Sequence, residues 1–197
     1  MTQEEIKKDK KVDEIMECMV CGRKSMHNSV VEIELPYFGK CLLTTLMCDE
    51  CGFRHNDIFV LEVNSPVKYE LRIDSEEDMS IRVARSNSCT ILIPELGLTV
   101  EPAGNSIAYI SNVEGVLERF EEVVGTMIRS ADDSTVSKGK EILKKIEDAK
   151  RGKEIITLIL KDPLGNSIID SGKAVKTGMS HEEAESLSGG LEIYDKG

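Results

Sequence analysis

Four of the six cysteines fall into two C-x-x-C-G motifs, and their spacing is the strongest chemical signal in the sequence. The first motif contributes Cys18 and Cys21, and the second contributes Cys48 and Cys51. A tight turn of this kind aims two thiolates at one point, and the glycine that follows permits a left-handed backbone behind the second sulfur. The segment between the motifs is long enough for a hairpin that brings them face to face. The pattern therefore predicts four thiolates arranged around one Zn²⁺ ion.

A four-thiolate shell is closed, and this limits what the zinc ion can do. The shell leaves no coordination position for water, so the ion is predicted to be structural and not catalytic. In small zinc modules, metal binding contributes about 10–16 kcal/mol, which explains how a segment with little core can fold. Two other uses of paired cysteines fit less well. A thioredoxin-type redox motif needs one C-x-x-C beside a βαβ unit, and iron–sulfur ligation is typical of a denser cysteine cluster.

The remaining cysteines and the histidines show no metal-binding pattern. Cys41 and Cys89 lie in strand-like apolar segments, and we expect both to be buried, inert thiols. His27, His55 and His181 are scattered and form neither an H-x-H nor an H-E-x-x-H pair, so a surface or capping role is expected for each. The sequence also contains no G-x-S-x-G, P-loop or G-x-G-x-x-G pattern. We therefore predict that the protein is not an enzyme.

The composition is that of an acidic globular protein. Its 197 residues, of which 40% are hydrophobic, suit one large domain or two small ones with a real core. The 36 acidic and 25 basic residues give a formal net charge of −11, which disfavours broad contact with phosphate backbones and favours basic protein partners. No stretch approaches the roughly 18 apolar residues of a membrane-spanning helix, and the chain opens without an apolar signal segment. We expect a soluble, cytoplasmic protein.

Along the chain, the pattern predicts a zinc module followed by a mainly β domain. Residues 1–17 mix lysines with acids and are expected to form a flexible lead or a frayed helix. Residues 18–60 are the zinc ribbon, with strand, turn and strand between the motifs. Residues 61–175 follow as short strands. The polar tail, residues 176–197, is expected to hold a short helix over 180–187 before a flexible end.

Period-2 alternation of apolar residues marks the strands of the second part. Residues 67–73 alternate strictly, and residues 155–160 form a dense apolar run. Residues 162–167 are predicted to be a turn, because they combine proline, glycine and asparagine. Many short strands without alternating helices favour a β-sandwich or a barrel, and the sequence leaves that choice open.

Two helices are predicted to interrupt the strands at about residues 111–152. Ser111 and Glu114 fit a capping box at the start of the first helix, and the second is expected over residues 137–150. Apolar residues of the first helix form one stripe: Val113, Val116, Leu117, Phe120, Val123, Val124 and Met127. The pair is expected to form an αα-hairpin. The stripe either seals this hairpin onto the sheet or stays partly open as a partner-binding face.

Taken in order, these motifs resemble those of the ZPR-type zinc-finger proteins. The matching segments cover nearly the whole chain: residues 18–22, 48–57, 78–79, 82–86, 93–96, 113–115 and 162–167. The resemblance implies an α+β, mainly β fold. In it, a four-Cys zinc ribbon precedes a double-stranded β-helix, or jelly-roll-like, domain with an inserted α-helical hairpin. Eukaryotic members look like two such modules in tandem, whereas this chain resembles the shorter archaeal-type members with one.

The resemblance also implies a binding function, because family members associate with translation elongation factor 1-alpha and assist its folding. We therefore expect a zinc-binding, non-catalytic, chaperone-like module that contains one structural Zn²⁺ and binds this factor. An RNA- or ribosome-associated zinc ribbon is the alternative function. A cupin-like enzyme is disfavoured, because the His/Glu metal set that cupins use is missing.

Three apolar residues of the ribbon are predicted to contact the partner. Met19, Val20 and Phe53 lie beside or between the metal ligands, where an apolar contact surface would be held rigidly.

Four polar residues in the shared motifs are further candidates for partner contact: Arg82, Arg85, Glu95 and Asn166. Structural roles compete with this interpretation. The two arginines are expected to pair with the acidic stretch at residues 74–78, and Asn166 to shape its turn.

Overall fold

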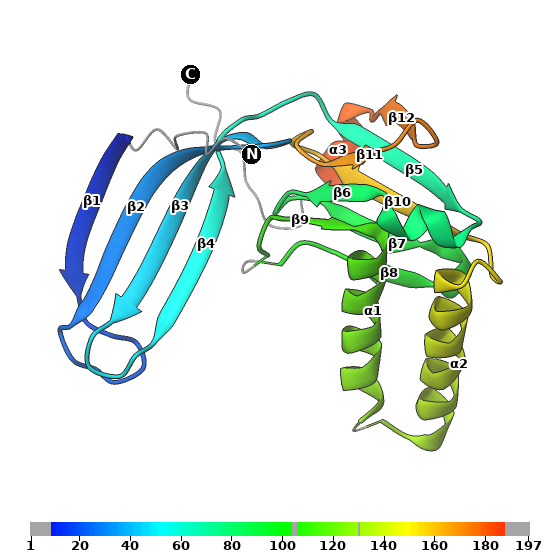
Figure 1. Cartoon of the computed structure of the whole chain (residues 1–197), viewed down its shortest axis with the longest axis horizontal. Helices are drawn as coiled ribbons and strands as arrows, with labels where there is room; N and C mark the ends of the chain where they lie inside the picture. The colour runs from blue at the N-terminus through cyan, green and yellow to red at the C-terminus, as the bar shows by residue number, and fades with distance from the viewer. Residues whose placement is uncertain (1–8, 104–105, 130, 188–197) are drawn as a thin grey trace.

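The computed structural model describes residues 9–103, 106–129 and 131–187, which form a zinc ribbon and a jelly roll (Figure 1). The ribbon is a four-stranded antiparallel sheet in the order β1-β2-β3-β4. Its strands are β1 (Asp9–Met16), β2 (Met26–Leu35), β3 (Gly39–Cys48) and β4 (Arg54–Val60). The predicted strand–turn–strand unit between the cysteine motifs is confirmed as β2 and β3.

The ribbon begins earlier than the sequence pattern indicates. Residues 9–16, which we expected to belong to a flexible lead, form strand β1 and pair antiparallel with β2. Edge strands tolerate charged residues, because one side of the strand needs no partner. The charged residues of this segment therefore did not indicate that it forms a strand. The first eight residues lie outside the described part of the chain.

Two sheets form the jelly roll, which resolves the choice between sandwich and barrel in favour of two layers. The five-stranded sheet has the order β12 (Val175–Gly178), β5 (Val67–Ile73), β10 (Ile156–Asp162), β7 (Thr90–Ile93) and β8 (Leu98–Val100). The three-stranded sheet has the order β11 (Ile168–Asp170), β6 (Arg82–Arg85) and β9 (Tyr109–Asn112). Two short 3-10 helices, η1 (Glu76–Ser80) and η2 (Pro94–Leu96), connect strands. The predicted mainly β fold class is confirmed.

Strict alternation in the central strands builds the core. Along β5, Leu71 and Ile73 are fully buried, and along β10, Leu158 and Leu160 face the same interior. These side chains belong to one apolar cluster that joins both sheets and the base of the helices. Since alternate residues of a strand point to opposite faces, the sequence period of two specifies which side is buried.

The predicted helical hairpin is confirmed as α1 (Val113–Ile128) and α2 (Asp133–Lys150). Asn112, and not Ser111, caps α1, since its side chain accepts a hydrogen bond from the N–H of Gly115 at 2.9 Å. Ser111 is instead paired with β6 as part of β9. The second helix starts four residues earlier than predicted, because Asp132 supplies an N-cap to the N–H of Thr135.

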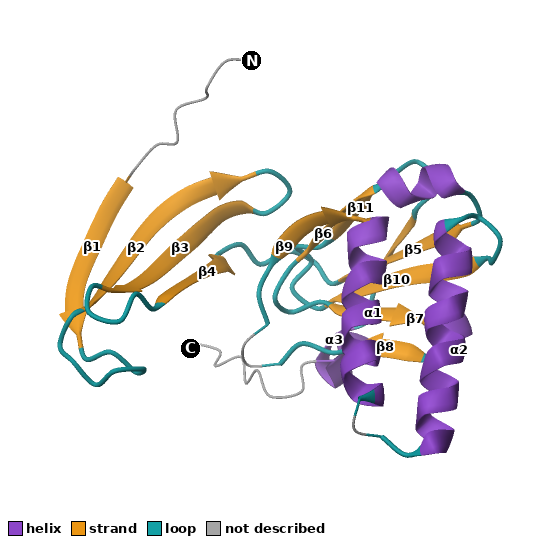
Figure 2. Cartoon of the chain, turned by 60° about the horizontal axis from the view of Figure 1, so that its bottom comes forward, coloured by secondary structure: helices purple, strands orange, loops and turns teal. Residues whose placement is uncertain are grey.

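The apolar stripe of α1 is divided between the two roles proposed for it. The residues that pack into the core or the hairpin are Val113, Val116, Leu117, Phe120 and Val124. Val123 and Met127 remain 48% and 63% exposed. Figure 2 shows α1 and α2 side by side, with their bases against the strands and their other ends extending beyond them. The stripe thus seals the base of the hairpin and stays open near its tip.

The C-terminal segment is more ordered than its polar composition suggests. The short helix expected over residues 180–187 is confirmed as α3 (His181–Leu187), which Ser180 caps by accepting the N–H of Glu183. Just before it, residues 175–178 form the edge strand β12 beside β5. The predicted flexible end, residues 188–197, lies outside the described residues. Within the described ranges, no helix is both long enough and apolar enough to cross a membrane.

A small junction joins the ribbon to the jelly roll. Phe38 and Cys41 of the ribbon pack against Ala84 and Ala108 of the jelly roll in a buried apolar cluster. The β2–β3 turn lies beside the three-stranded sheet (Figure 2). The ribbon is therefore attached at this turn, and its cysteine motifs lie at the opposite end.

We predict that Phe120→Asp destabilises the protein by at least about 3 kcal/mol, because it places a carboxylate among buried side chains at the hairpin base. Thermal or denaturant unfolding measures the effect. Met127→Asp, at an exposed position of the same helix, is the control and changes stability by about 0.5 kcal/mol or less. Equal stability of the two variants would contradict this packing.

A second prediction concerns acid stability. Although burial opposes it, hydrogen bonds from Lys173 and the N–H of Asp74 hold the pKa of Asp78 below its ordinary value. The carboxylate therefore stabilises the fold at neutral pH, and this contribution is lost as the pH falls through the lowered pKa that Asp78 has in the folded protein. We expect Lys173→Met to lower the unfolding midpoint by several degrees at pH 7, and this difference from the wild type to shrink steadily as the pH falls below the ordinary aspartate pKa of about 4. A pH-independent loss would show that the ion pair is not the cause.

Candidate metal centre

The two cysteine motifs meet in the loops that follow β1 and β3, at the end of the ribbon remote from the jelly roll (Figure 1). Their four sulfur atoms lie within 4.8 Å of one another. The Cys18–Cys51 and Cys21–Cys48 sulfur pairs are each 3.7 Å apart. Sulfurs about 2.3 Å from a central zinc ion lie about 3.8 Å apart in a tetrahedron, whereas a disulfide requires about 2.05 Å. The arrangement therefore fits one four-thiolate zinc site.

Both motifs use the same backbone turn. The N–H of Gly22 donates to the carbonyl of Cys18 at 2.8 Å, and the N–H of Gly52 donates to that of Cys48 at 3.0 Å. The two glycines have φ values of 71° and 72°, in the left-handed region where a side chain would be strained. The predicted need for glycine after each second cysteine is confirmed.

Electrostatics explain why the four thiols need a cation. A hydrogen bond between Ser25 and the Cys48 sulfur, at 3.2 Å, and a backbone N–H bond from Cys51 lower the pKa of Cys48 to about 6. For Cys51, the backbone N–H of Phe53 favours the thiolate, but burial and the neighbouring thiols together raise its pKa to about 12. Four thiolates cannot coexist here at neutral pH unless a positive charge lies among them. A bound Zn²⁺ supplies that charge.

A small apolar cluster supports the site. Cys18, Met26 and Cys48 are buried, and Leu46 and Phe53 pack against them. Phe53, one of the predicted partner contacts, thus lies against the metal ligands themselves. This cluster is separate from the core of the jelly roll. The metal therefore has a structural role, since it holds together an end of the ribbon that has little core of its own.

Comparison with known proteins gives the same two parts. The ZPR1 zinc-finger domain matches residues 11–60, and the ZPR1 jelly-roll domain matches residues 77–186, more than half of the chain. The chain belongs to the ZPR1 family. The zinc-finger match begins at residue 11, inside strand β1. This agrees with a ribbon that starts before the first cysteine motif.

Archaeal ZPR1-like proteins match over nearly the full length. The chain is 44% identical to one from Methanocaldococcus jannaschii over 182 residues, which cover 91% of this chain and 92% of that protein. A ZPR1-like protein of Pyrococcus horikoshii is 38% identical over 191 residues, or 93% and 85% of the two chains. These matches show the single-module form of the family, one zinc finger followed by one jelly roll.

Eukaryotic ZPR1 proteins are longer. The Schizosaccharomyces pombe relative, named zinc finger chaperone zpr1, is 29% identical over 146 residues, which cover 71% of this chain and 32% of that protein. Human zinc finger protein ZPR1 is 27% identical over 162 residues, which cover 80% of this chain and 35% of that protein. The chain thus spans about a third of these relatives. None of the four names states an enzyme activity.

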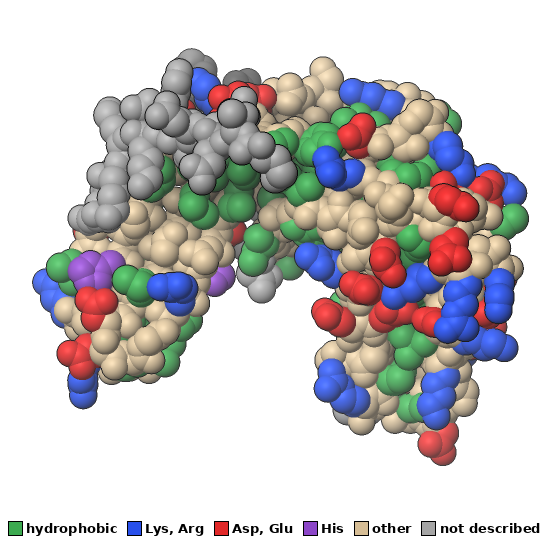
Figure 3. Space-filling view, viewed as in Figure 1, with side chains coloured by type: hydrophobic (Ala, Val, Ile, Leu, Met, Phe, Trp, Pro, Cys, Tyr) green, Lys and Arg blue, Asp and Glu red, His purple; other side chains and the backbone are tan. Residues whose placement is uncertain are grey.

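The remaining predicted partner contacts are spread over the molecule. On the first cysteine turn, Met19 and Val20 are 70% and 63% exposed, so their side chains contribute little to the fold. Figure 3 shows hydrophobic side chains at the surface of this end of the ribbon, among charged ones.

Arg82 and Arg85 do not pair with the acidic stretch at residues 74–78 as expected. Arg85 is buried, and its guanidinium donates to the carbonyl of Cys89 at 2.9 and 3.2 Å. Arg82 donates to the Tyr37 hydroxyl at 3.2 Å, which links the jelly roll to the ribbon. The partner of the acidic stretch is Lys173, which lies farther along the chain and reaches Asp74 and Asp78. The prediction relied on the short distance in sequence between the two arginines and the acidic stretch. In the folded protein, the strand arrangement brings Lys173 to the acidic residues instead.

Glu95 and Asn166 also make intramolecular bonds. Glu95 accepts from both the N–H and the hydroxyl of Thr157, and these bonds, against the effect of burial, hold its pKa below the ordinary value. Asn166 donates to the carbonyl of Glu62 at 2.6 Å and accepts from the amide of Asn64 at 2.8 Å. It therefore ties the predicted turn to the segment that joins the two domains.

The other cysteines and histidines do not enter the metal centre. Cys41 and Cys89 are fully buried, as predicted, and burial raises the pKa of Cys89 to about 12. His27 and His181 lie beside acidic groups, with His27 Nε2 2.8 Å from Asp49. Within the described part of the chain, the four motif cysteines are the one group of His, Cys, Asp and Glu side chains arranged to hold a metal.

Two residues that organise these sites, Ser25 and Asp162, were not predicted from the sequence. Ser25 lies beside a metal ligand, and its proximity to the first motif was the available signal. Asp162 is fully buried, although it opens a predicted turn. Its carboxylate accepts five hydrogen bonds, from the hydroxyls of Ser86, Ser88 and Ser167 and from the N–H groups of Leu164 and Asn166. The available signal was its position: an aspartate that opens a turn containing proline and glycine commonly accepts hydrogen bonds from the residues of that turn.

We predict that wild-type protein contains one zinc ion per chain and that Cys48→Ser loses it, with loss of structure across residues 18–60. A serine hydroxyl does not ionise at neutral pH, so the shell stays incomplete. Metal analysis and the amide NMR spectrum measure both effects. Cys41→Ser, a buried cysteine outside the shell, serves as the matched control and keeps its zinc. One-to-one zinc with an unchanged spectrum in the Cys48 variant, or iron in the wild type, would refute the assignment.

Proposed function

We propose that this protein is a non-catalytic, cytoplasmic, chaperone-like module that binds translation elongation factor 1-alpha, or its counterpart, and assists its folding. Membership of the ZPR1 family and the name of the fission yeast relative, a zinc finger chaperone, support a protein partner. The elongation factor as that partner follows from the family resemblance. Exposed apolar side chains of the ribbon support the same proposal.

The observation that carries the proposal is a group of exposed apolar side chains at the zinc end of the ribbon. We call this group the knuckle surface, and it consists of Ile15, Met19, Val20 and Met47. Sheet register places Ile15 and Met47 on either side of His27, in one row across the strands. Methionine is a flexible, polarisable side chain that adapts to varied apolar partners. Exposed apolar groups fixed by a structural metal suit the recognition of a folding intermediate, which itself exposes apolar surface.

Among the seven residues expected to contact the partner, Met19 and Val20 are the ones we assign to this surface. Both side chains are largely exposed, and the metal fixes the turn that carries them. Phe53 lies beneath this end of the ribbon and supports it. Arg85 and Asn166 are buried within the jelly roll or its junction. A partner that reached these two side chains would first have to displace their internal hydrogen bonds.

The RNA-binding alternative has less physical support. The ribbon carries acidic as well as basic side chains near the metal, and Arg23 and His27 are paired with Glu50 and Asp49. A site for a phosphate backbone requires unpaired cations, since affinity comes from the counterions that they release. The formal net charge of −11 opposes this further.

We predict that Met19→Asp combined with Val20→Asp reduces capture of purified elongation factor 1-alpha at least tenfold and abolishes assistance of its refolding from denaturant. Two charges at the centre of an apolar contact remove its hot spot. Zinc content and thermal unfolding stay unchanged, because both side chains are exposed. Co-precipitation and the yield of nucleotide-binding elongation factor measure the two effects.

Met127→Asp is the matched comparison, because it charges an exposed methionine on the hairpin tip instead. Capture that falls with Met127→Asp and not with the ribbon variant would move the interface to the hairpin and contradict the assignment. A gel shift with RNA that weakens as salt rises, without capture of the factor, would favour the alternative function.

A further inference from the structure

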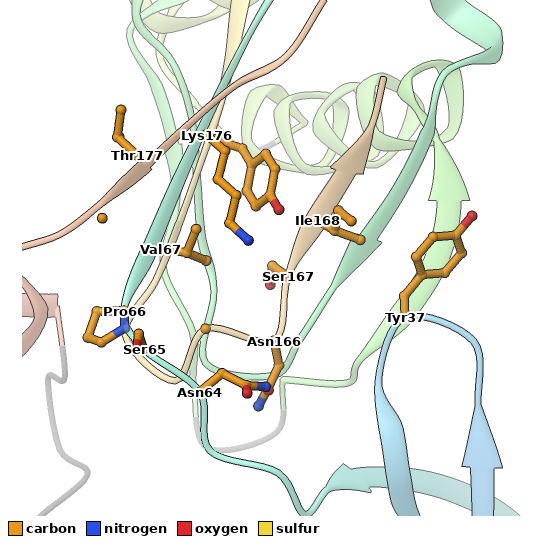
Figure 4. A pocket seen from close by; sticks show the side chains of 13 residues that line it. Tyr37, Asn64, Ser65, Pro66, Val67, Asn166, Ser167, Ile168, Lys176 and Thr177 are labelled. Carbon is orange, nitrogen blue, oxygen red and sulfur yellow. The ribbon is translucent and has the colours of Figure 1, made fainter. Parts of the chain in front are cut away.

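A second candidate site lies at the junction of the ribbon and the jelly roll, far from the metal. A cavity of about 490 Å³ opens there, a volume within the range of about 300–1,000 Å³ that is typical of ligand sites. Its walls are formed by the β2–β3 turn, the linker between the two domains (residues 61–66), the 162–167 turn and strands β5, β11 and β12. Figure 4 shows Lys176 and Thr177 on one wall and Tyr37 on the opposite one.

One cation points into this cavity without an acidic partner. Figure 4 shows the Lys176 ammonium directed inward, between Val67 and Ser167. Its nitrogen lies 5.6 Å from the ring centre of Tyr69, and it forms no ion pair within the described part of the chain. Lys68, Lys161 and Lys173, in contrast, each pair with a carboxylate.

Polar groups that can bind an oxyanion lie on the walls of the same cavity. Ser65 and Tyr69 line it, and their hydroxyls make no hydrogen bond with other described residues. An ammonium in a cavity that also holds hydroxyl donors matches the oxygens of a carboxylate. The chemistry therefore selects an acidic group.

The same cavity borders unpaired backbone groups of an edge strand. The N–H of Met179 donates to the carbonyl of Pro66, one step beyond the pairing of Gly178 with Val67. In an antiparallel ladder, alternate residues bond toward and away from the partner strand. Lys176 and Gly178 therefore direct their N–H and C=O groups away from β5, at the free edge of the sheet. Such an edge can accept another extended chain.

The far wall of the cavity holds a strained residue. Tyr37 has φ of 70° and is the one non-glycine residue in the described chain with positive φ. Its hydroxyl donates to Asp170 at 2.7 Å and accepts from Arg82. Backbone strain that the surroundings hold in place is concentrated at functional sites. The two hydrogen bonds of its hydroxyl attach the β2–β3 turn to the jelly roll at one wall of this cavity.

We propose that the junction cavity binds an extended peptide segment with an acidic side chain, which adds to the edge of β12 and places its carboxylate against Lys176. The proposal rests on the proposed function for the source of this peptide, a segment of the protein partner. Its test does not involve that partner.

A simpler role for Lys176 makes a different prediction. A lysine on the inner face of an edge strand discourages pairing with other chains. That role needs no cavity and no unpaired hydroxyls, and it predicts equal binding, or none, for acidic and neutral peptides.

The experiment titrates ¹⁵N-labelled full-length protein with two synthetic peptides, acetyl-Val-Thr-Glu-Val-Thr-amide and its Gln analogue. We expect saturable shifts of the Lys176 and Gly178 amides, slower hydrogen exchange at both, and about tenfold tighter binding of the Glu peptide. Lys176→Met abolishes the preference for Glu over Gln. Lys140→Met, on the exposed surface of α2, is the control and leaves it intact.

Three results would overturn the proposal: no saturable binding, equal affinity for both peptides in the wild type, or an unchanged preference in Lys176→Met. Sodium glutamate that saturates the same amides at the same concentrations would overturn the peptide assignment, because it would identify a site for small carboxylates. Failure here is distinct from failure of the proposed function, since capture of elongation factor by the knuckle surface is measured separately.

Discussion

The repulsion among four thiolates, relieved by one divalent cation, is the interaction on which the ribbon depends. The end of the sheet that carries them has one small apolar cluster and no continuity with the main core. Hydrogen bonds lower the pKa of the Cys48 thiol. The pKa values of Cys21 and Cys51 are raised, because burial and neighbouring thiols together outweigh a backbone hydrogen bond to each sulfur. Metal binding and folding of this end are therefore one process. Because the metal supplies the stability, the turn that holds it can leave Met19 and Val20 exposed.

The opposite end of the ribbon is held by a different kind of interaction. A few buried apolar side chains join it to the jelly roll, together with hydrogen bonds of Tyr37 to Asp170 and Arg82 and bonds between the 162–167 turn and the linker. Asn166 is central to this attachment because its turn is fixed from within by the buried carboxylate of Asp162. The 162–167 turn also brings Gly165 so close to Ser65 that a side chain there would strike the linker backbone. The ribbon is thus anchored at one end and presents its metal at the other.

The sequence predicted well what depends on local spacing. Two C-x-x-C-G motifs specify the metal site because four sulfurs and two glycines suffice to define it, and alternation along residues 67–73 specifies a buried face. It predicted poorly what depends on which strands become neighbours. Arg82 is hydrogen-bonded to Tyr37, and Asp78 to Lys173. In both pairs the two residues lie far apart in the sequence, so no local pattern predicts the contact. The lysines of the first strand resembled a solvated lead because an edge strand tolerates charge.

The polar residues of the shared motifs show why membership of a motif does not by itself assign a partner contact. Arg85 and Asn166 use their hydrogen-bonding groups within the fold, and Glu95 is bound on both oxygens by Thr157. Each of these bonds would have to break before the side chain met a partner, which costs more than contact by a side chain that is already free. Binding is therefore expected where side chains and backbone groups are not already engaged within the fold. Such groups are the exposed apolar side chains beside the zinc site, and Lys176 with the free edge of β12 at the junction. These two places lie at opposite ends of the ribbon, so a partner that used both would have to extend along it.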